Sequence, residues 1–68
     1  MDTQILKEVL DGILAYLDEH KQLHHQADVV EVIAADFHID FLTVRVAIDL
    51  LVVSRLIGKA PNGRIGGN

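Results

Sequence analysis

The chain has 68 residues, of which 50% are hydrophobic, and a formal net charge of −4 at pH 7. A single domain of this size buries only about 60% of the surface that its unfolded chain exposes, so the core is expected to be thin. Because half of the residues are apolar, either the core is unusually dense or a partner covers some of the apolar surface. The absence of cysteine excludes disulfide bonds and thiolate metal sites. Residues 1–12 contain Asp2, Lys7, Glu8 and Asp11, which argues against a signal peptide or a membrane span, and we expect a cytoplasmic protein without membrane contact.

The charge is divided unevenly along the chain. Residues 1–44 carry two basic and nine acidic side chains, a balance of −7, whereas residues 45–68 carry four basic side chains and one acid, a balance of +3. The net acidity argues against nucleic acid as a partner, but the basic final third keeps that possibility open.

The first predicted helix begins with Asp2 or Thr3 as its cap and runs to Leu17. Its apolar positions recur at helical spacing and form one broad stripe: Ile5, Leu6, Val9, Leu10, Ile13, Leu14 and Leu17. Gly12 interrupts this helix at a cost of about 1 kcal/mol relative to Ala, and it is expected to permit close packing of a neighbouring element. Residues 18–26 are polar apart from Leu23, which predicts a connection with at most one very short strand near Leu23.

Two shorter helices are predicted to follow, folded against each other across a tight corner at residues 38 and 39. Asp28 is expected to open the second helix, with Glu31 in the capping-box relation, and that helix ends near Phe37. Asp40 is expected to cap the third helix. The predicted buried positions are Val29, Val30, Ile33, Ala34 and Phe37 in the second helix, and Val44, Ala47, Ile48 and Leu51 in the third.

The last part of the chain predicts a β-hairpin. Residues 55–60 are expected to form a strand, residues 61–63 a tight turn, and residues 64–65 the returning strand. Residues 1–2 and 66–68 are expected to be frayed, within one domain that covers residues 1–68.

The corner and its helices carry a family resemblance. The residues concerned are Ile33, Ala34, Phe37, Ile39, Asp40, Thr43, Val44, Arg45, Ala47, Ile48, Leu50 and Leu51. They resemble the helix-turn-helix of winged-helix proteins, in which such an Ala lies in the first helix of the pair and a T-V-R run opens the recognition helix. The resemblance implies a mainly α fold with a small two- or three-stranded β-hairpin, the wing. The competing prediction is a plain three-helix bundle with a disordered tail.

The chain departs from the family pattern at two places. His38 stands at the corner where Gly is usual, a position that often needs a positive φ. Ser54 and Arg55 stand where a Leu-Gly pair commonly closes the recognition helix, so this helix is expected to end differently or to run on.

The resemblance implies that the third helix and the wing contact double-stranded DNA. Thr43 and Arg45 are the candidates on the helix, and Lys59, Asn62 and Arg64 are the candidates on the wing. Each also has a structural interpretation: Arg45 as a solvated charge, Thr43 as part of the corner, Asn62 as a turn residue, and the basic wing residues as protection of an edge strand.

The same helix offers a second interpretation. If the predicted stripe faces the core, then Phe41, Leu42, Arg45, Val46 and Asp49 face outward, and four of these five side chains are unsuited to a phosphate backbone. Phe41, Leu42 and Val46 would then form a protein interface. The sequence therefore supports a DNA-binding transcriptional regulator that acts as a homodimer, or alternatively a protein-interaction or assembly module. The homodimer interface is expected at the first helix around Gly12, or alternatively at Phe41, Leu42 and Val46.

No residue pattern indicates catalysis or a cofactor. Ser54 has no catalytic partner at a readable spacing, and no glycine-rich phosphate loop follows a strand, so the chain is not expected to be an enzyme. We considered a zinc site because the chain has four histidines, His20, His24, His25 and His38. A zinc site needs three or four converging ligands, and no metal is expected.

Overall fold

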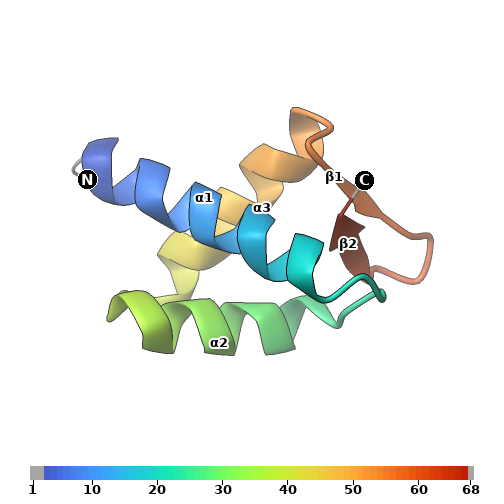
Figure 1. Cartoon of the computed structure of the whole chain (residues 1–68), viewed down its shortest axis with the longest axis horizontal. Helices are drawn as coiled ribbons and strands as arrows, with labels where there is room; N and C mark the ends of the chain where they lie inside the picture. The colour runs from blue at the N-terminus through green and yellow to red at the C-terminus, as the bar shows by residue number, and fades with distance from the viewer. Residues whose placement is uncertain (1–2, 68) are drawn as a thin grey trace.

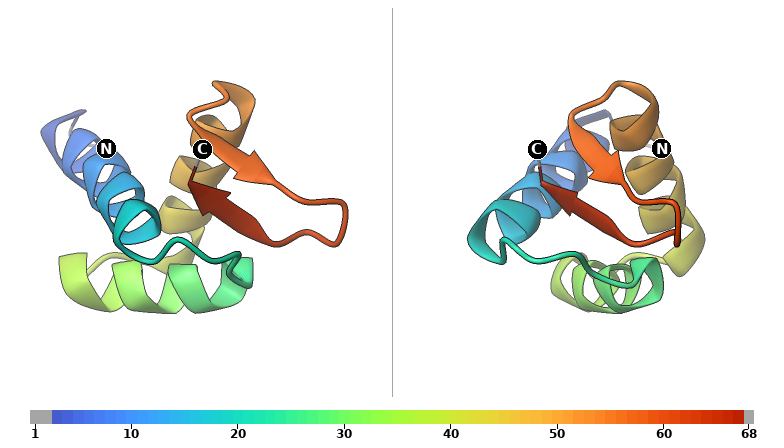
Figure 2. Two further views of the ribbon diagram at one scale, coloured as in Figure 1. Left: turned by 45° about the vertical axis from the view of Figure 1, so that its right-hand side comes forward. Right: turned by 90° about the vertical axis from the view of Figure 1, so that its right-hand side faces the viewer.

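The structure is a computed structural model that describes residues 3–67, with three helices followed by a two-stranded antiparallel hairpin (Figure 1). The elements are α1 (Thr3–Glu19), α2 (Gln26–Phe37), α3 (Phe41–Val53), β1 (Ile57–Lys59) and β2 (Ile65–Gly67). α1 and α3 cross each other, α2 lies beneath both, and the hairpin closes one end with β1 against α3 and β2 against α1 (Figures 1 and 2). The predicted mainly helical fold with a small hairpin is confirmed, and the plain bundle with a disordered tail is wrong.

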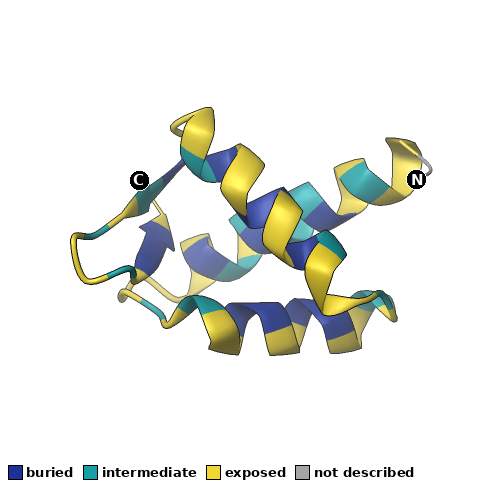
Figure 3. Cartoon of the chain, turned by 180° about the vertical axis from the view of Figure 1, so that it is seen from behind, coloured by how far each residue is buried: buried dark blue, intermediate teal, exposed yellow. Residues whose placement is uncertain are grey.

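The core lies where the inner faces of all five elements meet (Figure 3). Its buried residues are Val9, Ile13 and Leu17 of α1, Val29, Val30, Ile33 and Ala34 of α2, Val44, Ala47, Ile48 and Leu51 of α3, and Ile57 and Ile65 of the hairpin. The predicted stripes of α2 and α3 are confirmed, with Phe37 half-buried at the edge. The stripe of α1 is narrower than predicted, because Ile5 is 43% exposed.

α1 extends two residues beyond the predicted end, since Asp18 and Glu19 are helical. Near its middle, Gly12 lies directly against the aromatic ring of Phe37. A Cβ atom built on Gly12 would stand 2.6 Å from Cε2 and 2.7 Å from Cζ of that ring. The glycine therefore permits the close packing that the sequence predicts, and the neighbour is α2 of the same chain. The cap predicted at Asp2 lies outside the described residues.

The prediction that Asp28 opens α2 is wrong, because the helix begins at Gln26 and Asp28 lies in its first turn. His25 takes the N-cap position without a side-chain hydrogen bond, so the capping box with Glu31 is not formed. Instead, the backbone carbonyl of His25 accepts hydrogen bonds from the amides of Asp28 and Val29 at 3.1 and 3.3 Å. The preceding residue, His24, is bridged to the hairpin, which holds the chain at the place where the helix starts.

The corner between α2 and α3 has the backbone conformation that the sequence indicates. His38 has φ 55° and ψ 47°, the left-handed region, and the amide of Ile39 donates to the carbonyl of Ala34 at 3.1 Å. Asp40 then caps α3, as predicted: its Oδ2 accepts from the amide of Thr43 at 3.2 Å and its Oδ1 from the Thr43 hydroxyl at 2.6 Å. The hydroxyl bond first, and then the backbone amide bonds, hold the pKa of Asp40 below its ordinary value although some desolvation opposes them.

α3 is followed by a residue in the left-handed conformation, and this residue is Arg55 and not glycine. Arg55 has φ 65°, its amide donates to the Val52 carbonyl at 3.1 Å, and the Leu56 amide donates to the Leu51 carbonyl at 3.0 Å. This pair of bonds is the Schellman arrangement, which satisfies the last carbonyls of a helix. The predicted strand start at residue 55 is therefore wrong, because residues 55 and 56 belong to the helix end and β1 begins at Ile57.

The hairpin turn follows the predicted chemistry of residues 61–63. The Gly63 amide donates to the Ala60 carbonyl at 2.9 Å, Gly63 has φ 87°, and the Asn62 side-chain oxygen accepts from the Arg64 amide at 3.0 Å. The register pairs Lys59 with Ile65, residue 58 with residue 66, and residue 57 with residue 67.

The returning strand differs from its prediction. β2 begins at Ile65 and runs on through Gly66 and Gly67, which pair with β1 and are not frayed. The third strand expected near Leu23 is present as a single bridge: His24 and Ile65 exchange two backbone hydrogen bonds of 2.8 and 2.9 Å. The expectations for residues 1–2 and 68 fall outside the described residues.

Candidate functional site

The outer side of α3 carries five large apolar side chains in contact with solvent. Phe41, Leu42, Val46, Leu50 and Val53 are between 46% and 80% exposed. Arg45 and Asp49 are exposed on the same side. We call these seven residues the outward face of α3. Figure 3 views the molecule from the side on which α3 stands in front of α1, and the outer surface of its turns is largely exposed.

The outward face exists because α3 is apolar on nearly every side, with ten apolar residues among its 13. The core takes Val44, Ala47, Ile48 and Leu51. Successive residues of a helix are rotated by about 100°, so the side of α3 opposite to the core carries a row of Leu42, Val46, Asp49 and Val53. These residues are spaced four, three and four positions apart. This is the spacing with which one helix packs lengthwise against another.

The two charged members of the outward face are oppositely signed and one helical turn apart. Within residues 3–67 the structure gives neither Arg45 nor Asp49 a side-chain hydrogen bond or an ion pair. The outward face therefore offers an approaching surface one donor and one acceptor of opposite charge beside an apolar line.

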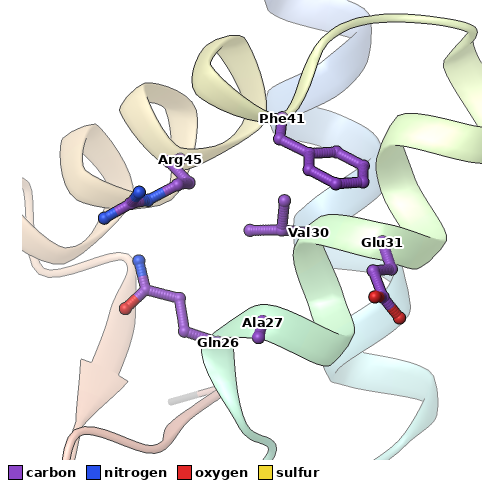
Figure 4. Close-up of a pocket in the computed structure, with 6 residues that line it drawn as sticks. All are labelled: Gln26, Ala27, Val30, Glu31, Phe41 and Arg45. Carbon is purple, nitrogen blue, oxygen red and sulfur yellow. The ribbon is translucent and has the colours of Figure 1, made fainter.

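A pocket of about 330 Å³ adjoins the outward face, between the first turns of α2 and α3 (Figure 4). Its lining residues are Gln26, Ala27, Val30, Glu31, Phe41 and Arg45. In Figure 4 the Phe41 ring and the Arg45 side chain extend from α3 to either side of Val30, and the Gln26 amide points up toward Arg45. Phe41 and Arg45 thus belong to both surfaces, which makes the pocket a lateral extension of the outward face.

The residues that the sequence predicts to contact DNA differ in their exposure and in the contacts that they make. Thr43 is half-buried and its hydroxyl is committed to the Asp40 cap. Asn62 is exposed but its side-chain oxygen is committed to the turn. Lys59 is exposed on β1. Arg64 is also exposed, and its Nη2 lies 3.1 Å from Nε2 of His25.

Arg45 and Arg64 do share one neighbourhood, the start of α2. Arg64 contacts His25, and Arg45 lines the pocket with Gln26, the first residue of that helix. The first turn of a helix exposes backbone amides and the positive end of the helix dipole, and His25 places no side-chain acceptor on them. Asp28 and Glu31 oppose this positive potential with two carboxylates in the same first two turns.

The interface residues of the sequence prediction fall into two groups. Phe41, Leu42 and Val46 are exposed side by side on α3. Gly12 is half-buried, and Phe37 of the same chain fills the space above it. The close approach that this glycine permits is thus already used inside the protomer.

Three of the four histidines, His20, His24 and His25, lie in the connection between α1 and α2, and His38 lies at the corner between α2 and α3. The rings of Tyr16, His20 and His24 contact one another at tilted or edge-on angles with centroids 4.6 to 6.0 Å apart, and Nε2 of His24 lies 3.0 Å from the His20 carbonyl oxygen. Across residues 3–67 no group of three or more His, Asp or Glu side chains is placed to hold a metal ion. None of the helices in that stretch has the length and apolar content to cross a membrane.

Two members of the outward face, Leu50 and Val53, were not identified from the sequence. The signal was present, because ten apolar residues in a helix of 13 exceed what one buried stripe can absorb. Continuing the spacing of Leu42, Val46 and Asp49 by four residues leads to Val53.

Comparisons of the chain with protein-family models, with curated proteins and with solved structures gave no match in any of the three.

Proposed function

We propose that the chain is a winged-helix domain that works as a protein-interaction module, with the outward face of α3 as its docking surface. The tight corner before α3 and the hairpin after it support the winged-helix assignment. The observation that carries the function is the exposure of Phe41, Leu42, Val46, Leu50 and Val53 on one helix. Full burial of an exposed Val, Leu or Phe side chain contributes about 1.5–3 kcal/mol. These side chains are already partly covered, so each contributes a part of that free energy and a partner that covers several of them gains the sum.

The same residues weigh against base reading by α3. A recognition helix reads base edges with hydrogen-bond donors and acceptors, and it lies between two rows of phosphates. Leu42 and Val46 supply neither donors nor acceptors, and the Asp49 carboxylate is repelled by phosphate. Arg45 alone on this face has the chemistry that duplex DNA requires.

The test compares a substitution on the outward face with one on the wing. Val46→Glu introduces a charge where a docking partner removes water, while Lys59→Glu removes a cation from β1. For a docking surface, Val46→Glu weakens association with protein, which includes self-association, at least tenfold, and Lys59→Glu leaves it unchanged. Association that responds to Lys59→Glu and ignores Val46→Glu would overturn the proposal.

DNA binding is the second candidate, and a specific observation favours it. The start of α2 lacks a side-chain cap and stands beside Arg45 and Arg64, an arrangement that can hold one phosphate. Titration of duplex DNA with the protein at rising salt decides between the two. A phosphate-binding protein loses affinity linearly in the logarithm of salt concentration, with a slope of about 0.9 per contact, and Arg64→Ala would reduce that slope by about one contact. Absence of binding at low salt rejects this candidate.

A further inference from the structure

We infer that the partner of the outward face is a second copy of this chain, with the two α3 helices packed antiparallel about a twofold axis at the level of Ala47. The inference rests on the proposed docking function of α3. A twofold interface requires a surface that is complementary to itself, so the apolar residues must meet apolar residues and each charge must meet its opposite.

The apolar residues satisfy this requirement. With a rise of about 1.5 Å per residue, Leu42 lies about 7.5 Å below the level of Ala47 and Val53 about 9 Å above it. In an antiparallel pair Leu42 therefore stands opposite Val53 of the second copy at both ends of the contact. Val46 and Leu50 lie on the same side of the line that joins Leu42 to Val53, and they meet the same two residues of the second copy.

The charges satisfy it as well. Arg45 and Asp49 lie about 3 Å below and above the level of Ala47, both on the flank opposite to Leu50. Rotation about the twofold axis reverses a residue's position along the helix but leaves it on the same side of the interface. Each Arg45 therefore stands opposite an Asp49 of the second copy, and the pair occurs twice. Parallel helices related by a twofold axis would instead place Arg45 beside Val46 and Leu50 of the second copy. Charge complementarity therefore selects the antiparallel arrangement, and both groups enter it without an intramolecular ion pair to break.

The size of the helix sets the expected strength. α3 has 13 residues and is about 20 Å long, so two such helices and their flanking side chains bury an area at the small end of specific interfaces, near 1,200 Å² in total. We expect a dissociation constant in the micromolar range, which sedimentation equilibrium measures directly.

The first experiment compares the wild-type chain with two substitutions of equally exposed aliphatic residues on different helices. Val46 is 46% exposed on α3 and Ile5 is 43% exposed on α1. Val46→Glu is expected to raise the dissociation constant at least tenfold, whereas Ile5→Glu leaves it unchanged. A second disrupting variant, Val53→Glu, guards against local unfolding because this residue is 80% exposed at the helix end. Circular dichroism of each variant shows that the helices remain formed.

The second experiment tests the antiparallel register through charge. Arg45→Glu places two carboxylates opposite each other twice per dimer, and Asp49→Arg places two guanidinium groups opposite each other twice. Each variant alone is expected to dimerise about tenfold more weakly, since two exposed pairs change from attraction to repulsion. Mixing the two variants restores wild-type affinity, because the mixed dimer regains two attractive pairs. Restoration in the mixture depends on contacts between chains and is independent of any effect inside one helix.

The outcomes separate the inference from the proposed function. A wild-type chain that stays monomeric into the high micromolar range overturns the inference, and so does a dimer that Ile5→Glu breaks and Val46→Glu does not. Failure of the mixed variants to recover affinity overturns the antiparallel register. Salt-dependent DNA binding that Arg45→Glu abolishes, by contrast, overturns the docking function itself.

Discussion

Replacing Gly12 by Ala tests the closest contact between α1 and α2. The added methyl group would stand 2.6 Å from Cε2 and 2.7 Å from Cζ of Phe37, well inside van der Waals contact. The ring must therefore shift or the helices must separate. Overpacking of this kind destabilises by about 1–3 kcal/mol, while exchanging Gly for Ala inside a helix stabilises by about 1 kcal/mol. The expected net effect is a loss of about 1 kcal/mol, or a fall in Tm of about 4–8 °C for a domain of this size.

The measurement is thermal and urea unfolding followed by circular dichroism, with two controls. Ala15 is exposed in the same helix, so Ala15→Gly reports the helix-propensity contribution alone and is expected to lower the free energy of unfolding by about 1 kcal/mol. In a Phe37→Leu background the clash is absent, and Gly12→Ala is then expected to stabilise by about 1 kcal/mol. The difference between the two backgrounds is the coupling between residues 12 and 37. Equal stabilisation in both backgrounds would refute the contact.

Three further predictions concern the corner, the α3 cap and the hairpin. His38→Gly relieves a side chain at φ 55° and is expected to raise the free energy of unfolding by about 1 kcal/mol in urea, whereas His38→Val lowers it; a loss on introducing glycine would contradict the left-handed conformation. The pKa of Asp40 is lowered in the folded state by the hydrogen bonds that it accepts from Thr43, so this carboxylate stabilises the fold above its unfolded pKa of about 4 and the contribution is lost as the pH falls through the lower folded value; Thr43→Val is expected to weaken the acid dependence of stability below about pH 4, which an unchanged profile would disprove. Ile65 is fully buried, and Ile65→Ala is expected to cost about 2–5 kcal/mol and to unfold the hairpin along with the helices in one transition, as judged by amide hydrogen exchange; independent melting of the hairpin would contradict its place in the core.

The features that the sequence determined by itself are those that depend on residues close together in the chain. Val44, Ala47, Ile48 and Leu51 recur at helical spacing, so they share one face whatever that face packs against. Asp40 reaches the amide of Thr43 across three residues, and Asn62 reaches the amide of Arg64 across two. Both hydrogen bonds join residues at most three positions apart, so the residue types at those positions are enough to predict them.

The sequence predicted only part of the outward face of α3. Phe41, Leu42 and Val46 were placed outward because the stripe of α3 faces inward, and their exposure confirms it. Val53 was missed although the spacing of Leu42, Val46 and Asp49 leads to it. Leu50 was missed because it lies nearer to the buried stripe, and a rotation of the helix by one residue would have buried it. The rotation is set by the packing of α3 on α1, α2 and β1, which no local pattern contains.

Tertiary structure alone decided where α2 and β2 begin and end, because their end residues form hydrogen bonds with distant segments of the chain. α2 starts at Gln26 and not at Asp28, because the bridge of His24 to Ile65 positions the His25 carbonyl to accept the first bonds of the helix. β2 runs through Gly66 and Gly67, residues with little intrinsic preference for strands, because β1 supplies their pairing partners. In both places the free energy comes from hydrogen bonds between segments far apart in sequence, and these form only once the helices have brought the segments together.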